Sequence, residues 1–162
     1  MTPGRTRHIV AAVALGAVLL GACGGGSGPK LSIAAFKRKA NTECQSLKAA
    51  SDAFQKAQSP TAEGKAVARY MRTAADRLRM LVRRVDELVP PDELAADVDS
   101  LLGVLSDYAD GIDHLASTVK GGERFQDVLQ KNAPTVNHLN KLATRAFNLV
   151  GTLGLVGCVL PG

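Results

Sequence analysis

The sequence predicts an all-α protein: an up-down antiparallel four-helix bundle with a C-terminal strap, after an N-terminal signal peptide. Two observations predict this fold. Apolar residues recur at alternating steps of four and three over long stretches, which is the spacing of one helix face, and glycine or proline residues separate those stretches. The 162 residues less 22 for the predicted signal leave 140, enough for one domain with one core.

The N-terminus has the pattern of an export signal. Arg5, Arg7 and His8 precede an apolar run over residues 9–20, which is shorter than the roughly 20 residues that a membrane-spanning helix needs. The run ends in Leu20-Gly21-Ala22-Cys23, which resembles the lipobox of bacterial lipoproteins. We therefore expect removal of residues 1–22 and transfer of diacylglycerol to Cys23. An ordinary cleaved signal that happens to end beside a cysteine is the alternative.

The domain is expected to begin after a short tether. Residues 23–31 comprise the lipidated cysteine and a linker rich in glycine, so the bundle domain is assigned to 32–162. A first helix is predicted over residues 32–58, where Cys44, Leu47 and Phe54 fall on one face. Ser59-Pro60-Thr61 is predicted to end this helix and to start the next.

The second and third helices have sustained heptad patterns. The second carries an apolar stripe from Val67 to Leu88, and Pro90-Pro91 ends it. The third is predicted from Asp92 to Val119, and Gly121-Gly122 follows it. A fourth apolar stretch covers residues 125–150, but Pro134 lies inside it and is expected to kink or split the helix near Asn132.

The last stretch, residues 147–160, is apolar and rich in glycine. It is too short and too interrupted by glycine for a second membrane helix. We interpret it as an extended strap that covers one side of the bundle. With small residues in the core, such a strap could leave a cavity for an apolar ligand; the alternative is that the small residues only let the helices approach closely. The residues concerned are Ala40, Ser51, Ala74, Ala143 and Ala146.

The three cysteines divide into one lipid acceptor and one pair. Outside the cytoplasm Cys44 and Cys158 can form a disulfide, and we expect them to be bonded to each other. The alternative, a metal pair, is disfavoured because two distant cysteines without CxxC or HxxxH spacing make a poor zinc site.

The charge excludes one class of partner and suggests a helix pairing. Removing Arg5 and Arg7 from 20 basic residues leaves 18 against 15 acidic ones, a net charge of +3, and the chain has no tryptophan. We therefore expect no nucleic-acid partner. The third helix has seven acids and no lysine or arginine, whereas the second is rich in arginine, so the two are expected to pair, with Arg84 opposite Asp97.

A basic strip is predicted on the outward face of the second helix. It could dock anionic lipid headgroups or an acidic partner, although the simpler interpretation is a solvated helix face interrupted by Asp76. The strip comprises Lys65, Arg69, Arg72, Arg79 and Arg83.

Signals for catalysis are weak. His114 and His138 fall on different helices, and no carboxylate has the Glu-x-x-His spacing of a bundle metal site. We expect no enzyme activity, no cofactor and no metal. Two functions stay open: a non-catalytic binding or scaffolding module of the cell envelope that contacts another protein, and a carrier or sensor of a small apolar ligand.

Several motifs together resemble the small lipoproteins of actinobacteria. Besides the signal and lipobox, these are Asn41-Thr42-Glu43-Cys44, Pro90-Pro91-Asp92-Glu93-Leu94 and Leu153-Gly154-Leu155-Val156-Gly157-Cys158. The resemblance implies a helical domain, with a disulfide from the first helix to the C-terminus, on the extracytoplasmic face of the cell membrane. It implies no activity, ligand or catalytic residue.

Overall fold

The computed structural model describes residues 28–158, and this part of the chain is all-helical. Its helices are α1 (Ile33–Cys44), α2 (Leu47–Ala57), α3 (Lys65–Asp86), α4 (Asp92–Thr118), α5 (Phe125–Lys131) and α6 (Ala133–Leu153). None of them combines the length and the apolar character that a membrane span requires. The predicted signal peptide, Cys23 and residues 24–27 of the tether lie outside the described residues.

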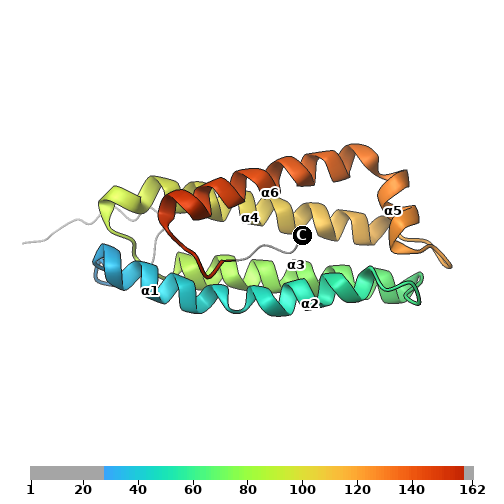
Figure 1. Cartoon of the computed structure of the whole chain (residues 1–162), viewed down its shortest axis with the longest axis horizontal. Coiled ribbons are helices and arrows are strands. Elements are labelled where there is room, and N and C mark those ends of the chain that lie inside the picture. The colour runs from blue at the N-terminus through green and yellow to red at the C-terminus, as the bar shows by residue number, and fades with distance from the viewer. Residues whose placement is uncertain (1–27, 159–162) are drawn as a thin grey trace, which may run out of the picture.

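The long helices pack side by side around one core (Figure 1). α3 packs against α2 on one side and α4 on the other, α4 also packs against α6, and α1 continues the line of α2 beside α3. The apolar stripe predicted for α3 is buried as expected, as is the stripe of α4; the α3 residues are Val67, Met71, Ala74, Leu78, Leu81 and Val85. The heptad pattern therefore identified both central helices correctly.

The first predicted helix is two helices in the structure. The α-helical hydrogen bonding stops at Cys44, where Gln45 and Ser46 donate their N–H groups to the carbonyls three residues earlier. The Ser46 hydroxyl donates to the Glu43 carbonyl at 2.8 Å, which stabilises the tight turn. Neither residue is a helix breaker, so the prediction of one helix over 32–58 was wrong.

The second predicted helix starts later than expected. α3 begins at Lys65, because Gly64 before it has a positive φ of 47° and donates its N–H to the Glu123 carbonyl at 2.8 Å. A Cβ on Gly64 would lie 3.1 Å from the Gly122 nitrogen, so only glycine fits this approach of two loops. The Arg124 guanidinium and the Glu63 carboxylate, 3.2 Å apart, join the same loops.

Pro134 acts as predicted at the start of the last long helix. α5 ends at Lys131 and α6 begins at Ala133, with proline in its first turn, where no intrahelical N–H is needed. α5 contacts α2 through Phe125, whose ring packs edge to face against the ring of Phe54 with 5.3 Å between the ring centroids. The split near Asn132 is therefore confirmed.

The described part of the predicted extended strap is helical up to Leu153. α6 continues to Leu153 and ends in a Schellman motif: Gly154 has φ 65°, and Leu155 donates its N–H to the Val150 carbonyl at 3.0 Å. Among the described residues of this stretch, 154–158 leave the helix and turn toward α1 (Figure 1). Within this turn Leu155 and Cys158 are buried, so the described part of the strap is short but does cover the core.

Cys44 and Cys158 form a disulfide, as predicted. Their Cα atoms are 4.8 Å apart although 114 positions separate them in the sequence. The Gly157 N–H also donates to the Asn41 side-chain oxygen at 2.9 Å. The turn after α6 is therefore fixed to α1 by a covalent bond and a hydrogen bond.

Candidate functional site

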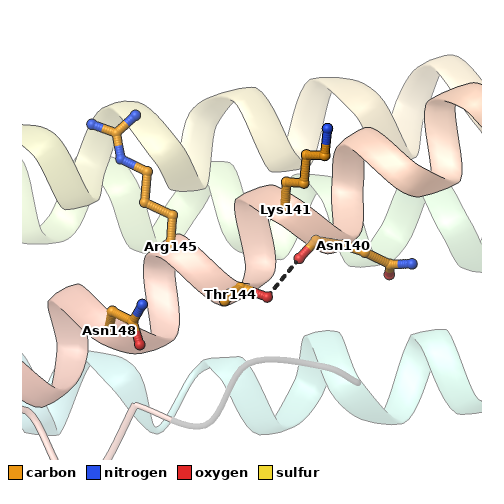
Figure 2. Close-up of a pocket in the computed structure, with 5 residues that line it drawn as sticks. All are labelled: Asn140, Lys141, Thr144, Arg145 and Asn148. Atoms are coloured by element: carbon orange, nitrogen blue, oxygen red, sulfur yellow. Dashed lines mark hydrogen bonds between the residues drawn. The ribbon is translucent and has the colours of Figure 1, made fainter.

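A shallow hollow of about 420 Å³ lies on the outer surface of α6 (Figure 2). Its lining residues come from two neighbouring rows of α6, because side chains four positions apart lie in one row along a helix. The Thr144 hydroxyl donates to the Asn140 carbonyl at 3.0 Å, and in Figure 2 Lys141 and Arg145 project together to the side of α6 opposite Thr144. The lining residues are Asn140, Lys141, Thr144, Arg145 and Asn148.

The hollow carries positive charge that the fold does not neutralise. α6 contains no acidic residue, and neither Lys141 nor Arg145 forms an ion pair with any residue from 28 to 158. The other lining side chains are amides and a hydroxyl, which can donate and accept hydrogen bonds. The lining therefore suits an anionic or hydrogen-bonding partner, and it contains no carboxylate, imidazole or thiol for acid–base or nucleophilic chemistry.

A second concavity, of about 570 Å³, lies beside the disulfide. One wall is the α1–α2 junction and the polar side of α2, and Gly157 of the C-terminal turn closes one edge. Lys48 and Asp52, one helical turn apart on this wall, form an ion pair at 3.6 Å. Its volume is within the range of small-molecule sites. Apolar atoms form most of its surface, although several of its side chains end in polar groups; the lining residues are Cys44, Gln45, Leu47, Lys48, Ser51, Asp52, Gln55 and Gly157.

The apolar core has little free space. A void among buried side chains of α1–α4, α6 and the C-terminal turn measures about 10 Å³, no more than one water molecule occupies. Three of the small residues considered for a cavity, Ala40, Ala74 and Ala146, are fully packed against their neighbours. In the described part of the chain these alanines let the helices approach closely.

The predicted basic strip on α3 is partly neutralised within the fold. Arg79 lies 2.8 Å from Asp110 and 3.3 Å from Asp113 on α4, and Arg72 reaches Asp113 at 4.0 Å. The hydrogen bond to Asp110 is the main cause that raises the pKa of Arg79, although burial opposes it. The other strip residues, Lys65, Arg69 and Arg83, are exposed.

The predicted pairing of Arg84 with Asp97 is not formed. Arg84 reaches Glu43 of α1 instead, at 3.3 Å. The first helix, which lies beside α3, supplies the carboxylate, so the ion pair joins α1 to α3 rather than α3 to α4. The broader expectation, that arginines of α3 meet acids of α4, holds at Arg79 and Arg72.

Shifted pKa values occur away from both concavities. Burial raises the pKa of Tyr108 in the core. The backbone N–H of Lys120, which donates to Glu123 at 2.6 Å, and then the ammonium of Lys131 lower the pKa of Glu123. Among residues 28–158, no three His, Cys, Asp or Glu side chains gather in a way that could hold a metal ion.

Comparison with protein-family models, curated protein sequences and solved structures found no match. The site therefore has to be interpreted from its own residues. Sequence reasoning missed the α6 hollow, although one signal was available: residues 133–153 contain basic but no acidic side chains.

Proposed function

We propose that the protein is a lipoprotein, anchored through Cys23 on the extracytoplasmic face of the cell membrane, whose domain is a non-catalytic binding or scaffolding module of the envelope. The domain would be an up-down antiparallel four-helix bundle with a C-terminal strap. The lipobox-like Leu20-Gly21-Ala22-Cys23 supports the anchor, and the Cys44–Cys158 disulfide is compatible with an oxidising compartment.

One observation carries the binding role: the α6 hollow presents Lys141 and Arg145 without ion-pair partners in the described part of the chain. Arg79, by contrast, forms ion pairs with two carboxylates of α4, so its charge is neutralised within the fold. Unpaired cations beside amide side chains can instead form charge-assisted hydrogen bonds with a partner protein.

A photo-crosslinking amino acid at position 144 tests the binding role in intact cells. Thr73 on α3 is the matched control, because both threonines are exposed and both donate to the carbonyl four residues earlier. We expect a defined crosslinked product from position 144 and none from position 73. Equal yields from both, or none from either, would argue against a specific contact at α6.

Cellular fractionation tests the anchor separately. The wild-type chain is expected in the membrane fraction, and Cys23→Ala is expected to lose lipidation and maturation at this site. Cys44→Ala keeps the acceptor cysteine while removing the disulfide, and it should stay lipidated. Labelling of Cys23→Ala with a radioactive fatty acid as strong as that of Cys44→Ala would reject the lipobox interpretation.

The carrier of a small apolar ligand stays as the alternative function. The concavity of about 570 Å³ beside the disulfide supports it, whereas the packed core offers about 10 Å³. Native mass spectrometry distinguishes the two functions. An excess mass that disappears on denaturation would favour the carrier.

A further inference from the structure

Large apolar side chains are exposed at three places in the described part of the chain. Ile33, Phe147 and Val156 are 44%, 72% and 89% exposed. Ile33 opens α1, Phe147 lies in the last two turns of α6, and Val156 belongs to the turn that connects α6 to α1. These segments meet at the same end of the molecule in Figure 1. We call the surface formed by α1, residues 154–158 and the last two turns of α6 the tether-side face.

The tether-side face is held together as one surface. The disulfide between Cys44 and Cys158 and the hydrogen bond from Gly157 to Asn41 fix the turn on α1. The Lys37 ammonium also lies against Gly154, 3.0 Å from where a Cβ would be. Apolar and basic side chains from distant parts of the sequence thus keep a fixed arrangement.

The charge of this face is positive. Its acid, Glu43, is paired with Arg84 at 3.3 Å. Its basic residues, Lys37, Arg38 and Lys39, form no ion pair with any residue from 28 to 158. By contrast, α4 has seven of the fifteen acids of the chain and no lysine or arginine.

The lipid attachment site is covalently close to this face. Ser32 caps α1 by accepting a hydrogen bond from the Ala35 N–H, so α1 starts here. Residues 28–31 lie against the turn between α3 and α4, where the Leu31 N–H donates to the Val89 carbonyl at 3.0 Å and the Lys30 ammonium pairs with Asp92 at 2.6 Å. Residues 24–27 separate Gly28 from Cys23, so Cys23 can lie at most about 18 Å from Gly28. The tether therefore keeps the start of α1 close to any bilayer that holds a lipid on Cys23.

We propose that the tether-side face rests on the anionic bilayer surface to which the chain is anchored. Phe147 and Val156 enter the interface between headgroups and acyl chains, and Lys37, Arg38 and Lys39 contact lipid phosphates. The proposal rests on the lipid anchor of the proposed function. It adds an orientation: the bundle lies with α1 and the end of α6 toward the membrane.

Tryptophan fluorescence tests this orientation in the lipidated protein. The chain contains no tryptophan, so Phe147→Trp introduces a single reporter, and Thr73→Trp, at an exposed position of α3, is the matched control. Both variants are reconstituted into vesicles of phosphatidylcholine and phosphatidylglycerol with brominated acyl chains. We expect bromine to quench the reporter at position 147 but not the one at position 73, and the quenching to fall in phosphatidylcholine alone or at high salt. Absent quenching at position 147, or quenching equal to that at position 73, overturns the proposal.

Charge reversal supplies the second readout. Arg38→Glu with Lys39→Glu should lower the quenching of the reporter at position 147 strongly, because loss of one basic contact weakens binding to an anionic surface about fivefold. Arg77→Glu with Arg83→Glu makes the same charge change on exposed residues of α3 and should leave the quenching unchanged. An equal effect of both pairs would show a non-specific response to net charge and overturn the proposal.

Flotation of the same vesicles separates this proposal from the anchor. If the protein floats with the vesicles but position 147 is not quenched, the lipid anchor is present and the proposed orientation is wrong. Protein that does not float shows that the lipid anchor itself is wrong. A crosslink to a protein from position 147 in intact cells, without quenching, would assign the face to a protein partner instead.

Discussion

Cys44 at the end of α1 is bonded to Cys158 in the turn after α6, across 114 positions of the sequence. The bond holds Leu155 and Cys158 over the core, next to Leu47 and Val150. Residues 154–158 therefore cover the core between the end of α1 and the end of α6.

Removing this disulfide should cost much of the stability. A loop of this length is expected to contribute about 4–5 kcal/mol by restricting the unfolded chain. Cys44→Ala with Cys158→Ala should lower the free energy of unfolding by about that amount, measured in guanidinium chloride. Reduction of the wild-type chain is the matched control and should give a similar loss. A double variant as stable as the oxidised wild type would contradict the role of the bond.

Arg79 and Asp110 should be energetically coupled. Their atoms are 2.8 Å apart, and the Arg79 side chain is 31% exposed, so screening by water is incomplete. A double-mutant cycle with Arg79→Ala and Asp110→Ala should give a coupling of about 0.5–1 kcal/mol. Arg77→Ala, an exposed arginine on the same helix, should change the stability by less than about 0.5 kcal/mol. A coupling of zero would show that the close approach of Arg79 and Asp110 contributes nothing to the free energy of unfolding.

Two glycines of α4 should respond differently to alanine. A Cβ on Gly103 would meet no atom within 4 Å, whereas one on Gly111 would lie 2.5 Å from Leu139 Cδ2. Gly103→Ala should stabilise the helix by about 0.5–1 kcal/mol. Gly111→Ala should lose that gain, with a net cost of about 1 kcal/mol, because the buried Leu139 must move. Thermal unfolding that ranks the two variants in the opposite order would contradict the close packing of α4 and α6.

Glu123 should make the stability depend on pH in the acidic range. Its pKa is lowered in the folded chain, so its contribution is present above the pKa of an unfolded glutamate and is lost as pH falls through the folded value. Urea unfolding of the wild type and of Glu123→Gln should therefore differ near neutral pH and converge on acidification. A difference that is constant with pH would mean that the carboxylate is not stabilised by Lys120 and Lys131.

Much of the fold was predictable because proline and glycine act locally. Pro90 and Pro91 end the second apolar stretch and Asp92 starts the third, and Pro134 divides the fourth, as the backbone chemistry requires. The apolar stripes of α3 and α4 follow directly from helical periodicity.

The break between α1 and α2 had no such local signal. Gln45 and Ser46 are ordinary helix residues in sequence, and the turn becomes evident only from the Ser46 hydroxyl bonded to Glu43. The end of α6 also differs from the prediction, because the glycines of residues 147–160 indicated an extended segment rather than a helix. The structure accommodates Gly151 inside α6 and uses Gly154, with its positive φ, to end it.

The candidate site was less predictable, because charge compensation depends on which helices are neighbours. Seen along the sequence, Arg79 and Arg145 are both arginines on amphipathic helices. In the fold, Arg79 meets two carboxylates of α4, whereas Arg145 lines an open hollow. The candidate binding site is therefore on α6 and not, as the sequence suggested, on α3.

The central claim, a disulfide-bonded helical domain held on the membrane by its N-terminal cysteine, is tested most directly by intact mass spectrometry of the protein extracted from membranes. We predict a chain that begins at Cys23, carries a diacylglyceryl group with or without an amide-linked acyl chain, and lacks the two hydrogens that the Cys44–Cys158 bond removes. A chain that retains residues 1–22, or one without lipid on Cys23, would contradict the account.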